Sequence, residues 1–371
     1  MPIADPEKPI RKSLTIHEVA SRAGVSSATV TRVLNGHPGV TTKTRRQVQD
    51  VLDITGYQVN AIARSLRTNR VATVAHILSS LVPNPFFANV ARGLQQEATN
   101  FGYEVLVYNV EDSAEIEQQA VQAALRRRAD AIIFTTPLRA ENVSLASSAG
   151  VRVVQVERPT EAPSAVVTVD NYCGAREATE YLISLGHQDI AFIGRRINNN
   201  RSANASVEIA RLEGYLDAMQ QSGARSEVVL GEYYMTGLSE FQPLGRGYAE
   251  RVLARGQVPT AIFAASDILA AGVLQALYSD AIRVPEHVSV VGFDDTYAAA
   301  LTPSLSTVAV PMDEVGRAAF RAAVVEPLVD EVRLETHLVV RESTGAPPSV
   351  PRSAERFAST LAGSAAHHLD A

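Results

Sequence analysis

From Val71 onward the chain alternates between short β-branched runs and helical patterns. The runs are VATVAHIL, EVLVYNV, DAIIFTT, VRVVQV, AVVTV, DIAFIG, TAIFAA and VSVVGF, and amphipathic segments such as NVARGLQQEATNFG and GAREATEYLISLG lie between most of them. Strands that are apolar almost throughout, separated by helices, predict parallel sheets covered by helices on both faces. The units are too many for one small sheet. The sequence therefore predicts an α/β core of two lobes that divide near Asp170.

Composition narrows the function classes. Cys173 is the only cysteine, so no intramolecular disulfide is possible, and no apolar run has the length of a membrane span. Because the N-terminus also lacks the apolar stretch of a signal peptide, we expect a cytoplasmic protein without a membrane partner. G-x-S-x-G, H-E-x-x-H, P-loop and G-x-G-x-x-G patterns are missing, so we expect neither an enzyme nor a bound cofactor or metal.

The charge is unevenly distributed along the chain. Residues 1–70 hold eleven Lys and Arg against five Asp and Glu, a net charge of +6, whereas the whole chain carries −6. A basic N-terminal part on an acidic remainder indicates that only the first part meets a polyanion. Chance segregation of a few charges is the alternative.

Three short helices are predicted in this basic part. Thr15 followed by Glu18 is a capping box, and Gly24 ends the first helix. Ser26 can cap a second helix, and Thr41 or Thr42 can cap a third. Two short helices joined by a turn and followed by a third form a helix-turn-helix pattern.

The second of these helices lies in SSATVTRVLNG, residues 26–36. Helical spacing places Val30, Val33 and Leu34 on its inner side. Its outer side consists of small or hydroxylated residues and one arginine: Ser27, Ala28, Thr29 and Arg32. Arginine can bind guanine in a bidentate manner, hydroxyls adapt to several base edges, and a methyl group suits thymine. We therefore expect this face to contact bases in the major groove, with simple solvent exposure as the alternative.

The order of motifs resembles one known family over about residues 14–345. TIHEVASRAGVSSATVTRVLNG, NAIARSL, NPFF, GAREATEYLISLGHQDIAFIG, RLEGY and VPEHVSVVGFDDT occur in sequence. They resemble the lactose-repressor/galactose-repressor (LacI/GalR) family of bacterial transcriptional regulators. The resemblance implies a helix-turn-helix head, a hinge helix and a two-lobed core like a periplasmic binding protein.

The resemblance also implies where each part begins and ends. We expect a disordered arm at 1–13, the DNA-binding domain at 14–59 and the hinge helix or linker at 60–70. The first core lobe takes 71–170 and 301–328, and the second takes 171–300 and 329–345. A flexible tail follows at 346–371. It lacks a leucine heptad, so we expect a homodimer rather than a tetramer.

By resemblance, Ser27 and Ala28 occupy the main base-reading positions, and Arg32 is a further contact. Hydroxyls, amides and helix N-termini predict phosphate contacts at six positions: Thr15, Ser26, Asn35, His37, Thr42 and Thr44. In the hinge, Asn60, Ala63 and Leu66 match the element that lies in the minor groove, where Leu66 would wedge into a base step. Packing between head and core is the alternative for Leu66. Val59 stands where many relatives have proline.

Ligands of such cores sit between the lobes, where the strand ends meet. By resemblance the effector-binding residues are Phe86, Phe87, Glu157, Arg158, Arg211, Ser266, Asp267 and Asp294. A carboxylate and a guanidinium flanked by aromatic rings suit a polyol. The alternative for one of the two phenylalanines is a purely core role, and the alternative for Asp170 and Asp267 is that of a helix N-cap. The polar insert RRINNNRSANASVEIA, which begins at Arg195, indicates an altered ligand selectivity.

These observations predict a sequence-specific transcriptional regulator. We expect a repressor that binds a near-palindromic double-stranded operator as a homodimer, under allosteric control by a sugar or related polyol. The alternatives are a transport-type ligand-binding protein, which shares the core fold, and a regulator that acts mainly as an activator.

Overall fold

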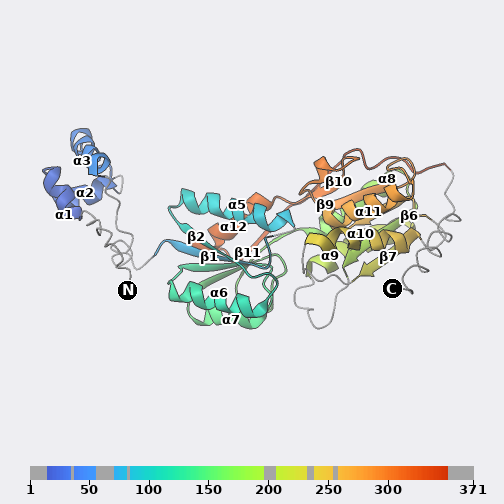
Figure 1. The fold of residues 1–371 in the computed structure, drawn as a ribbon, viewed down its shortest axis with the longest axis horizontal. Coiled ribbons are helices and arrows are strands. Elements are labelled where there is room, and N and C mark those ends of the chain that lie inside the picture. The colour runs from blue at the N-terminus through green and yellow to red at the C-terminus, as the bar shows by residue number, and fades with distance from the viewer. Residues whose placement is uncertain are drawn as a thin grey trace, which may run out of the picture. The chain divides into compact units, whose positions relative to one another are not determined.

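The computed structural model of the chain describes residues 15–34, 37–55, 71–81, 84–195, 206–231, 238–253 and 258–349. It divides into two units, Met1–Val71 and Ala72–Ala371 (Figure 1). Several sequence-based predictions lie outside the described residues: the arm at 1–13, Asn35, the hinge at 60–70 with Asn60, Ala63 and Leu66, most of the polar insert, and all but the start of the tail at 346–371.

The first unit contains the three predicted helices, α1 (Ile16–Arg22), α2 (Ser27–Leu34) and α3 (Thr42–Thr55). Their apolar faces form one small core of Val19, Ala20, Ala23, Val30, Val33, Val48 and Leu52. A core of this size gives only marginal stability by itself, and the hydrogen bonds at the helix ends therefore matter for the stability of this unit.

The helix ends confirm the predicted caps. The Thr15 hydroxyl accepts a hydrogen bond from the Glu18 amide at 3.4 Å, and the Glu18 carboxylate accepts from the Thr15 amide at 2.6 Å, which completes the capping box. Thr41, rather than Thr42, caps α3 by accepting from the Thr44 amide at 3.3 Å. Gly24 has a φ of +60°, a conformation that a β-carbon disfavours, in the turn between α1 and α2.

The second unit is built on two six-stranded sheets. The first has the order β11-β5-β4-β3-β1-β2 and is parallel throughout. Its strands are β1 (Thr73–Leu78), β2 (Glu104–Asn109), β3 (Ala131–Thr135), β4 (Arg152–Val156), β5 (Ala165–Val169) and β11 (Glu331–Leu334).

The second sheet has the order β12-β10-β9-β8-β6-β7. Its strands are β6 (Asp189–Arg195), β7 (Arg225–Gly231), β8 (Ala261–Ala264), β9 (Ser289–Asp294), β10 (Ser306–Ala309) and β12 (His337–Val339). All neighbours are parallel except β12, which runs antiparallel to β10 at the edge. The parallel architecture predicted from the sequence is confirmed, and β12 is the exception to it.

Helices cover both faces of each sheet. In the first lobe, α5 (Pro85–Asn100) and α12 (Met312–Val324) cover one face, and α6 (Ala114–Arg126) and α7 (Ala140–Ser148) cover the other (Figure 1). Alternation along β1 explains this, because Val74 and Leu78 pack with the first pair of helices while Ala75 and Ile77 pack with the second.

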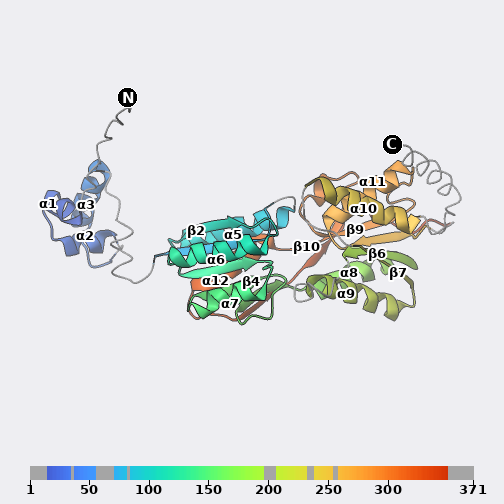
Figure 2. The ribbon, with the colours of Figure 1, turned by 60° about the horizontal axis from the view of Figure 1, so that its bottom comes forward.

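The second lobe repeats this arrangement. One face of its sheet carries α8 (Asn171–Ser184) and α9 (Ser206–Ser222), and the other carries α10 (Leu238–Leu253) and α11 (Asp267–Ser279) (Figure 2). A short 3₁₀ helix, η2 (Ala298–Ala300), follows β9. Asp170 caps α8 by accepting from the Cys173 amide at 2.9 Å, as its sequence position predicts.

The late segments alternate between the lobes more often than expected. The expected boundaries assign 301–328 to the first lobe and 329–345 to the second. However, β10 belongs to the second sheet, α12 packs on the first lobe, β11 joins the first sheet and β12 returns to the second. The boundaries are wrong here because β10, β11 and β12 are too short for their pairing partners to be evident from their composition. The connections after β5, after β10 and after β11 therefore all link the lobes.

Candidate functional site

The predicted DNA-reading face lies on α2. Ala28 and Arg32 are exposed, Ser27 and Thr29 are half-buried, and Val30 on the opposite side is buried. The face is therefore available at the positions that the helical spacing indicates. Ser27 is held in place, since its hydroxyl lies 2.9 Å from Nδ1 of His17 on α1.

His17 was missed by the sequence analysis. It is exposed on the helix that precedes the predicted reading helix, and its ring positions a residue of that helix. An imidazole of this kind can also donate to a phosphate. His17 and Ser27 lie on different helices, so no repeat within one helix relates them, and only the packing of α1 against α2 brings them together.

The predicted phosphate contacts have local structural duties as well. Ser26 caps α2 by accepting from the Thr29 amide at 3.1 Å, and the Ser26 and Thr29 hydroxyls lie 2.8 Å apart. The Thr44 hydroxyl lies 2.9 Å from that of Thr41, while Thr42 is exposed at the start of α3. Thr15 is the N-cap of α1.

His37 follows the residues that are not described after α2. Its ring accepts a hydrogen bond from the Gly39 amide at 3.1 Å, and its carbonyl accepts from the Arg45 guanidinium at 2.8 Å. Arg45 therefore holds the loop at His37. Lys43 and Arg46 are exposed and contribute positive charge to the surface.

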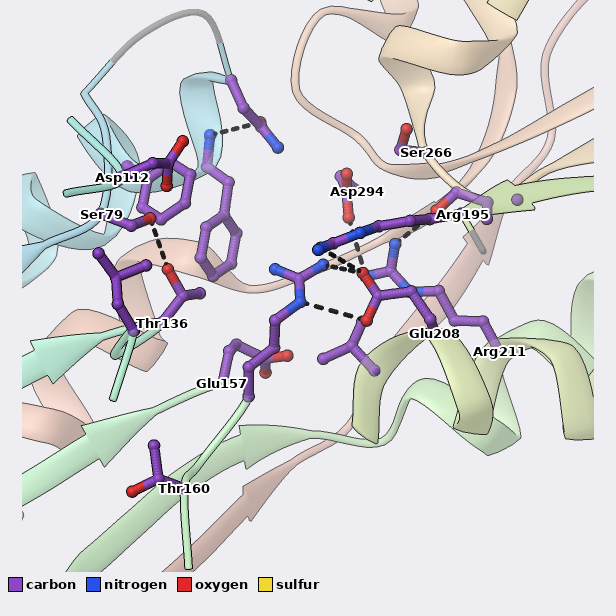
Figure 3. Close-up of a pocket in the computed structure, with 18 of the residues that line it drawn as sticks. Ser79, Asp112, Thr136, Glu157, Thr160, Arg195, Glu208, Arg211, Ser266 and Asp294 are labelled. Carbon is purple, nitrogen blue, oxygen red and sulfur yellow. Dashed lines mark hydrogen bonds and ion pairs between the residues drawn. The ribbon is translucent and has the colours of Figure 1, made fainter. Parts of the chain in front are cut away.

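A cavity of about 640 Å³ lies between the two lobes of the second unit (Figure 3). Its walls come from the carboxyl ends of the strands, where ligands of parallel α/β proteins bind. Ser79, Thr136 and Glu157 follow β1, β3 and β4 of the first sheet. Arg195 and Asp294 end β6 and β9 of the second.

Arg211 on α9 organises the second-lobe wall. Its Nε donates to Asn171 Oδ1 at 2.8 Å, its Nη1 to the Ala265 carbonyl at 2.6 Å, and its Nη2 to Asp294 Oδ1 at 3.0 Å. The guanidinium also stacks over the Phe293 ring, 3.7 Å from its centroid. Three of its five N–H donors are thus used within the described protein, which leaves two for a ligand.

Asp294 is buried at the end of β9 and has a φ of +111°, an unusual backbone conformation for a residue with a β-carbon. Burial raises the pKa of its carboxyl group, and the nearby Arg211 guanidinium offsets only part of that rise. Arg211 and Asp294 therefore form a fixed pair that presents both a donor and an acceptor to the cavity.

Glu157 lies at the end of β4 on the first-lobe side. One carboxylate oxygen accepts from the Val169 amide at 2.9 Å and the other from Asn171 Nδ2 at 3.3 Å. Burial raises its pKa, while Arg211 and Arg158 lower it in part. Glu157 and Arg211 thus meet through the side chain of Asn171, a residue that the sequence analysis did not identify.

Arg158 points across the cavity to a residue that was also missed. Its Nε and Nη2 donate to the two carboxylate oxygens of Glu208 on α9, at 3.2 and 2.7 Å. Arg195 adds a third contact to Glu208 at 3.4 Å. Burial raises the pKa of Glu208, but the two arginines outweigh it and bring that pKa down to about 2. The polar insert was flagged by its composition, but composition could not identify Glu208 within it.

Both predicted aromatic residues line the cavity. Phe86 and Phe87 stand at the start of α5 with their rings edge to face, 5.4 Å apart at an angle of 84°. Both rings also belong to the first-lobe core. Because each of them lines the cavity as well, neither has a purely core role. Asn84, the N-cap of α5, accepts from the Phe86 amide at 3.0 Å and lies on the same wall.

Ser266 and Asp267 take different places. Ser266 lines the cavity and caps α11 by accepting from the Leu269 amide at 3.4 Å. Asp267 is fully buried and lies behind the wall, where it accepts from the Thr296 amide at 2.8 Å and the Thr307 hydroxyl at 2.6 Å. Asp267 is therefore not among the residues that line the cavity. The alternative prediction, that Asp267 is a helix N-cap, is also wrong, because Ser266 is the N-cap of α11.

Other chemistry is sparse in the described part of the chain. No three His, Cys, Asp or Glu side chains gather there in a way that could hold a metal ion. Within the same residues, no helix is both long enough and apolar enough to span a bilayer.

Two families match this chain. Residues 15–60 match bacterial regulatory proteins of the lacI family, and residues 179–344 match the periplasmic binding protein-like domain. Catabolite control protein A of Priestia megaterium is 32% identical over 318 residues, which is 83% of this chain and 91% of that relative.

Solved structures agree in fold. A complex of the transcriptional regulator CelR with cellobiose is 30% identical, covers 89% of this chain and 99% of its own, and has a TM-score of 0.63. The Lac repressor dimer bound to operator and the anti-inducer ONPF is 25% identical, covers 90% and 100%, and has a TM-score of 0.72. With identity above 30% over most of its length, this chain belongs to the lacI family of bacterial regulatory proteins.

Proposed function

We propose that the protein is a transcriptional repressor that binds a near-palindromic operator as a homodimer and is controlled by a sugar or related polyol in the interlobe cavity. The observation that carries the proposal is the pairing of two features in one chain. They are the exposed face of α2, with Ala28 and Arg32, and an interlobe cavity that contains the Arg211–Asp294 pair.

DNA recognition is assigned to α2 and to the hinge. Arg32 has the length and donors for a bidentate contact with guanine, whereas Ser27 and Ala28 are small and read little by themselves. We assign Thr15, Ser26, His37, Thr42 and Thr44, together with Asn35 outside the described residues, to phosphate contacts. Leu66, with Asn60 and Ala63, belongs to the proposed minor-groove element. Insertion of the Leu66 side chain between two base pairs would bend the DNA, so the sequence preference would also depend on how easily the central base step deforms.

The cavity is assigned a binding role and no catalytic one. A sugar presents hydroxyls that both donate and accept, and Arg211 and Asp294 offer the matching pair. Phe86 and Phe87 supply apolar ring surface, and Ser266, Glu157 and Arg158 add polar groups at the walls. The CelR complex holds cellobiose, and cavities of about 300–1,000 Å³ are usual for small-molecule sites, a range that includes the 640 Å³ found here.

Control of DNA binding requires that the effector prefer one arrangement of the lobes. Any such preference changes operator affinity by the same factor by which operator binding changes effector affinity. Whether the sugar releases the operator or promotes its binding depends on which arrangement it favours, so either sign of coupling agrees with the proposal.

The test selects bound sites from random DNA with the full chain. We expect a symmetric site with a pyrimidine–purine step at its centre. Arg32→Ala should then cost about 1–3 kcal/mol at one symmetric base pair, roughly 5- to 150-fold in affinity, with other positions unchanged. Equal loss on all sequences would assign Arg32 to phosphate alone. DNA binding without any sequence preference would refute the repressor proposal, and activation of a reporter by the bound protein would replace repression with activation.

A further inference from the structure

The ion pair between Arg158 and Glu208 connects the two lobes directly. Arg158 follows β4 of the first sheet, and Glu208 lies in the first turn of α9, which packs on the second sheet. The Nε and Nη2 atoms of Arg158 donate to the two carboxylate oxygens of Glu208, at 3.2 and 2.7 Å. This bidentate geometry is the strongest form that such a pair takes in proteins.

The environment makes this pair stronger than a surface ion pair. The Glu208 side chain is only 9% exposed and that of Arg158 is 24% exposed, so solvent screens the pair little. Arg195, at 3.4 Å, adds a second positive charge from the same lobe as Glu208. A carboxylate in the first turn of a helix is further favoured by the helix dipole.

The backbone that presents Arg158 is unusual. Glu157 and Arg158 both have positive φ values, +51° and +28°, which side chains with a β-carbon rarely adopt. Such conformations persist only where the surroundings enforce them. Here the Glu157 side chain is fixed by the Val169 amide and by Asn171, which leaves Arg158 directed at Glu208 on the other lobe.

We propose that Arg158 and Glu208 form an interlobe latch that keeps the cavity closed in the absence of effector. A latch of this kind sets the equilibrium between open and closed lobes before any ligand arrives. The effector then acts on an equilibrium that already lies toward closure, which reduces the shift that its binding has to supply. The latch concerns the lobes alone, and it can be tested without DNA and without knowledge of the effector.

The test measures the distance between the lobes in the full chain by pulsed electron spin resonance. Spin labels are placed at Gln122→Cys on α6 and Gln220→Cys on α9, both exposed, in a Cys173→Ser background. Labelled protein is mixed with excess unlabelled protein so that each measured pair lies within one chain. Glu208→Gln and Arg158→Gln should each raise the ratio of open to closed lobes on the order of 10- to 100-fold, as expected for a lost hydrogen bond between charged groups.

Two comparisons keep the test specific. Glu180→Gln breaks the exposed pair with Arg176 at 2.7 Å within α8 and should leave the distances unchanged. The double variant Arg158→Gln/Glu208→Gln should open the lobes no further than the stronger single variant, because the two residues act as one pair. Unchanged distances in both single variants would overturn the proposal, as would effects that simply add in the double variant. Either single variant suffices if the other fails to fold, which its thermal transition reports.

Discussion

The Arg211 side chain offers the sharpest test of how the cavity wall is stabilised. Arg211→Ala removes the partner of the Asp294 carboxylate, which is 8% exposed, and leaves the Ala265 carbonyl and the Asn171 side chain without their donor. Breaking one side of a buried ion pair costs about 3–5 kcal/mol, because the remaining charge stays buried without compensation. Water can enter from the cavity, so we expect the lower end of the range, about 3 kcal/mol.

A loss of this size lowers the unfolding midpoint of the second unit by about 6–9 °C, at about 2–3 °C per kcal/mol for a unit of this size. Differential scanning calorimetry of the purified variant measures the shift. Removing both partners, in Arg211→Ala/Asp294→Ala, should recover part of the loss because the buried Asp294 carboxylate, which Arg211→Ala leaves without its partner, is then absent.

The loss should also depend on pH. Burial already raises the pKa of Asp294, and removal of Arg211 raises it further. The folded state then keeps a proton that the unfolded state has released, so stability falls as pH rises above the unfolded pKa of about 4. Arg211→Ala should therefore be less destabilising at about pH 5 than at about pH 8. A midpoint shift independent of pH, or a double variant no more stable than the single one, would refute this reasoning.

Three further predictions concern packing, capping and titration. A β-carbon at Gly93 would collide with the Asp313 carbonyl where α5 meets α12, so Gly93→Ala should lower the free energy of unfolding by about 1–3 kcal/mol, as measured by chemical denaturation. Gly247→Ala is the control: its β-carbon meets no atom within 4 Å, so it should raise the free energy of unfolding by about 0.5–1 kcal/mol. Thr15→Ala breaks the first capping box and should destabilise the head by about 1 kcal/mol in thermal melts followed by circular dichroism; an unchanged melt would contradict the cap. Burial, and after it the neighbouring Asp294, raises the pKa of Asp267 to about 7. The free energy of unfolding should therefore fall as pH rises from about 4 to 7, and Asp267→Asn should flatten that dependence. Equal slopes of unfolding free energy against pH in both proteins would contradict this prediction.

The sequence alone predicted the elements whose patterns are strong and local. Each of the eight β-branched runs from Val71 onward became a strand. Most of these strands are buried on both faces and therefore need apolar residues throughout, whereas β2, at the sheet edge, is partly exposed and still keeps β-branched residues. The caps at Thr15, Ser26 and Asp170 were equally local, since a short hydroxyl or carboxylate reaches only the amides of its own first turn.

Elements defined by distant partners were harder to predict. β7, with the sequence RSEVVLG, is an edge strand with exposed residues, and β10, β11 and β12 have only three or four residues each. Their sheet membership depends on which strand they meet, which no local pattern records. The lobe boundaries after residue 300 were wrong for that reason.

The candidate site divides in the same way. Arg211 and Asp294 could be expected from family motifs, and the structure places them 3.0 Å apart. Glu208 could not, because nothing in its local sequence shows that an arginine fifty residues earlier faces it across the cavity. Asp267 was misplaced because Ser266, one residue earlier, satisfies the helix start and lets the aspartate turn inward.

We propose that a ligand in the interlobe cavity controls operator binding by the α2 face. The most direct measurement is a fluorescence anisotropy titration of the selected operator with the full chain, with and without the sugar identified by thermal-shift screening, for the parent and for Asp294→Asn. An asparagine oxygen can still accept from Arg211, so this hydrogen bond of the cavity wall is kept while the charged acceptor is lost. We predict that the sugar changes the operator Kd of the parent at least several-fold and that Asp294→Asn binds the operator equally well but loses most of this change. An equal change in both proteins would show that the sugar does not act through Asp294 and the interlobe cavity.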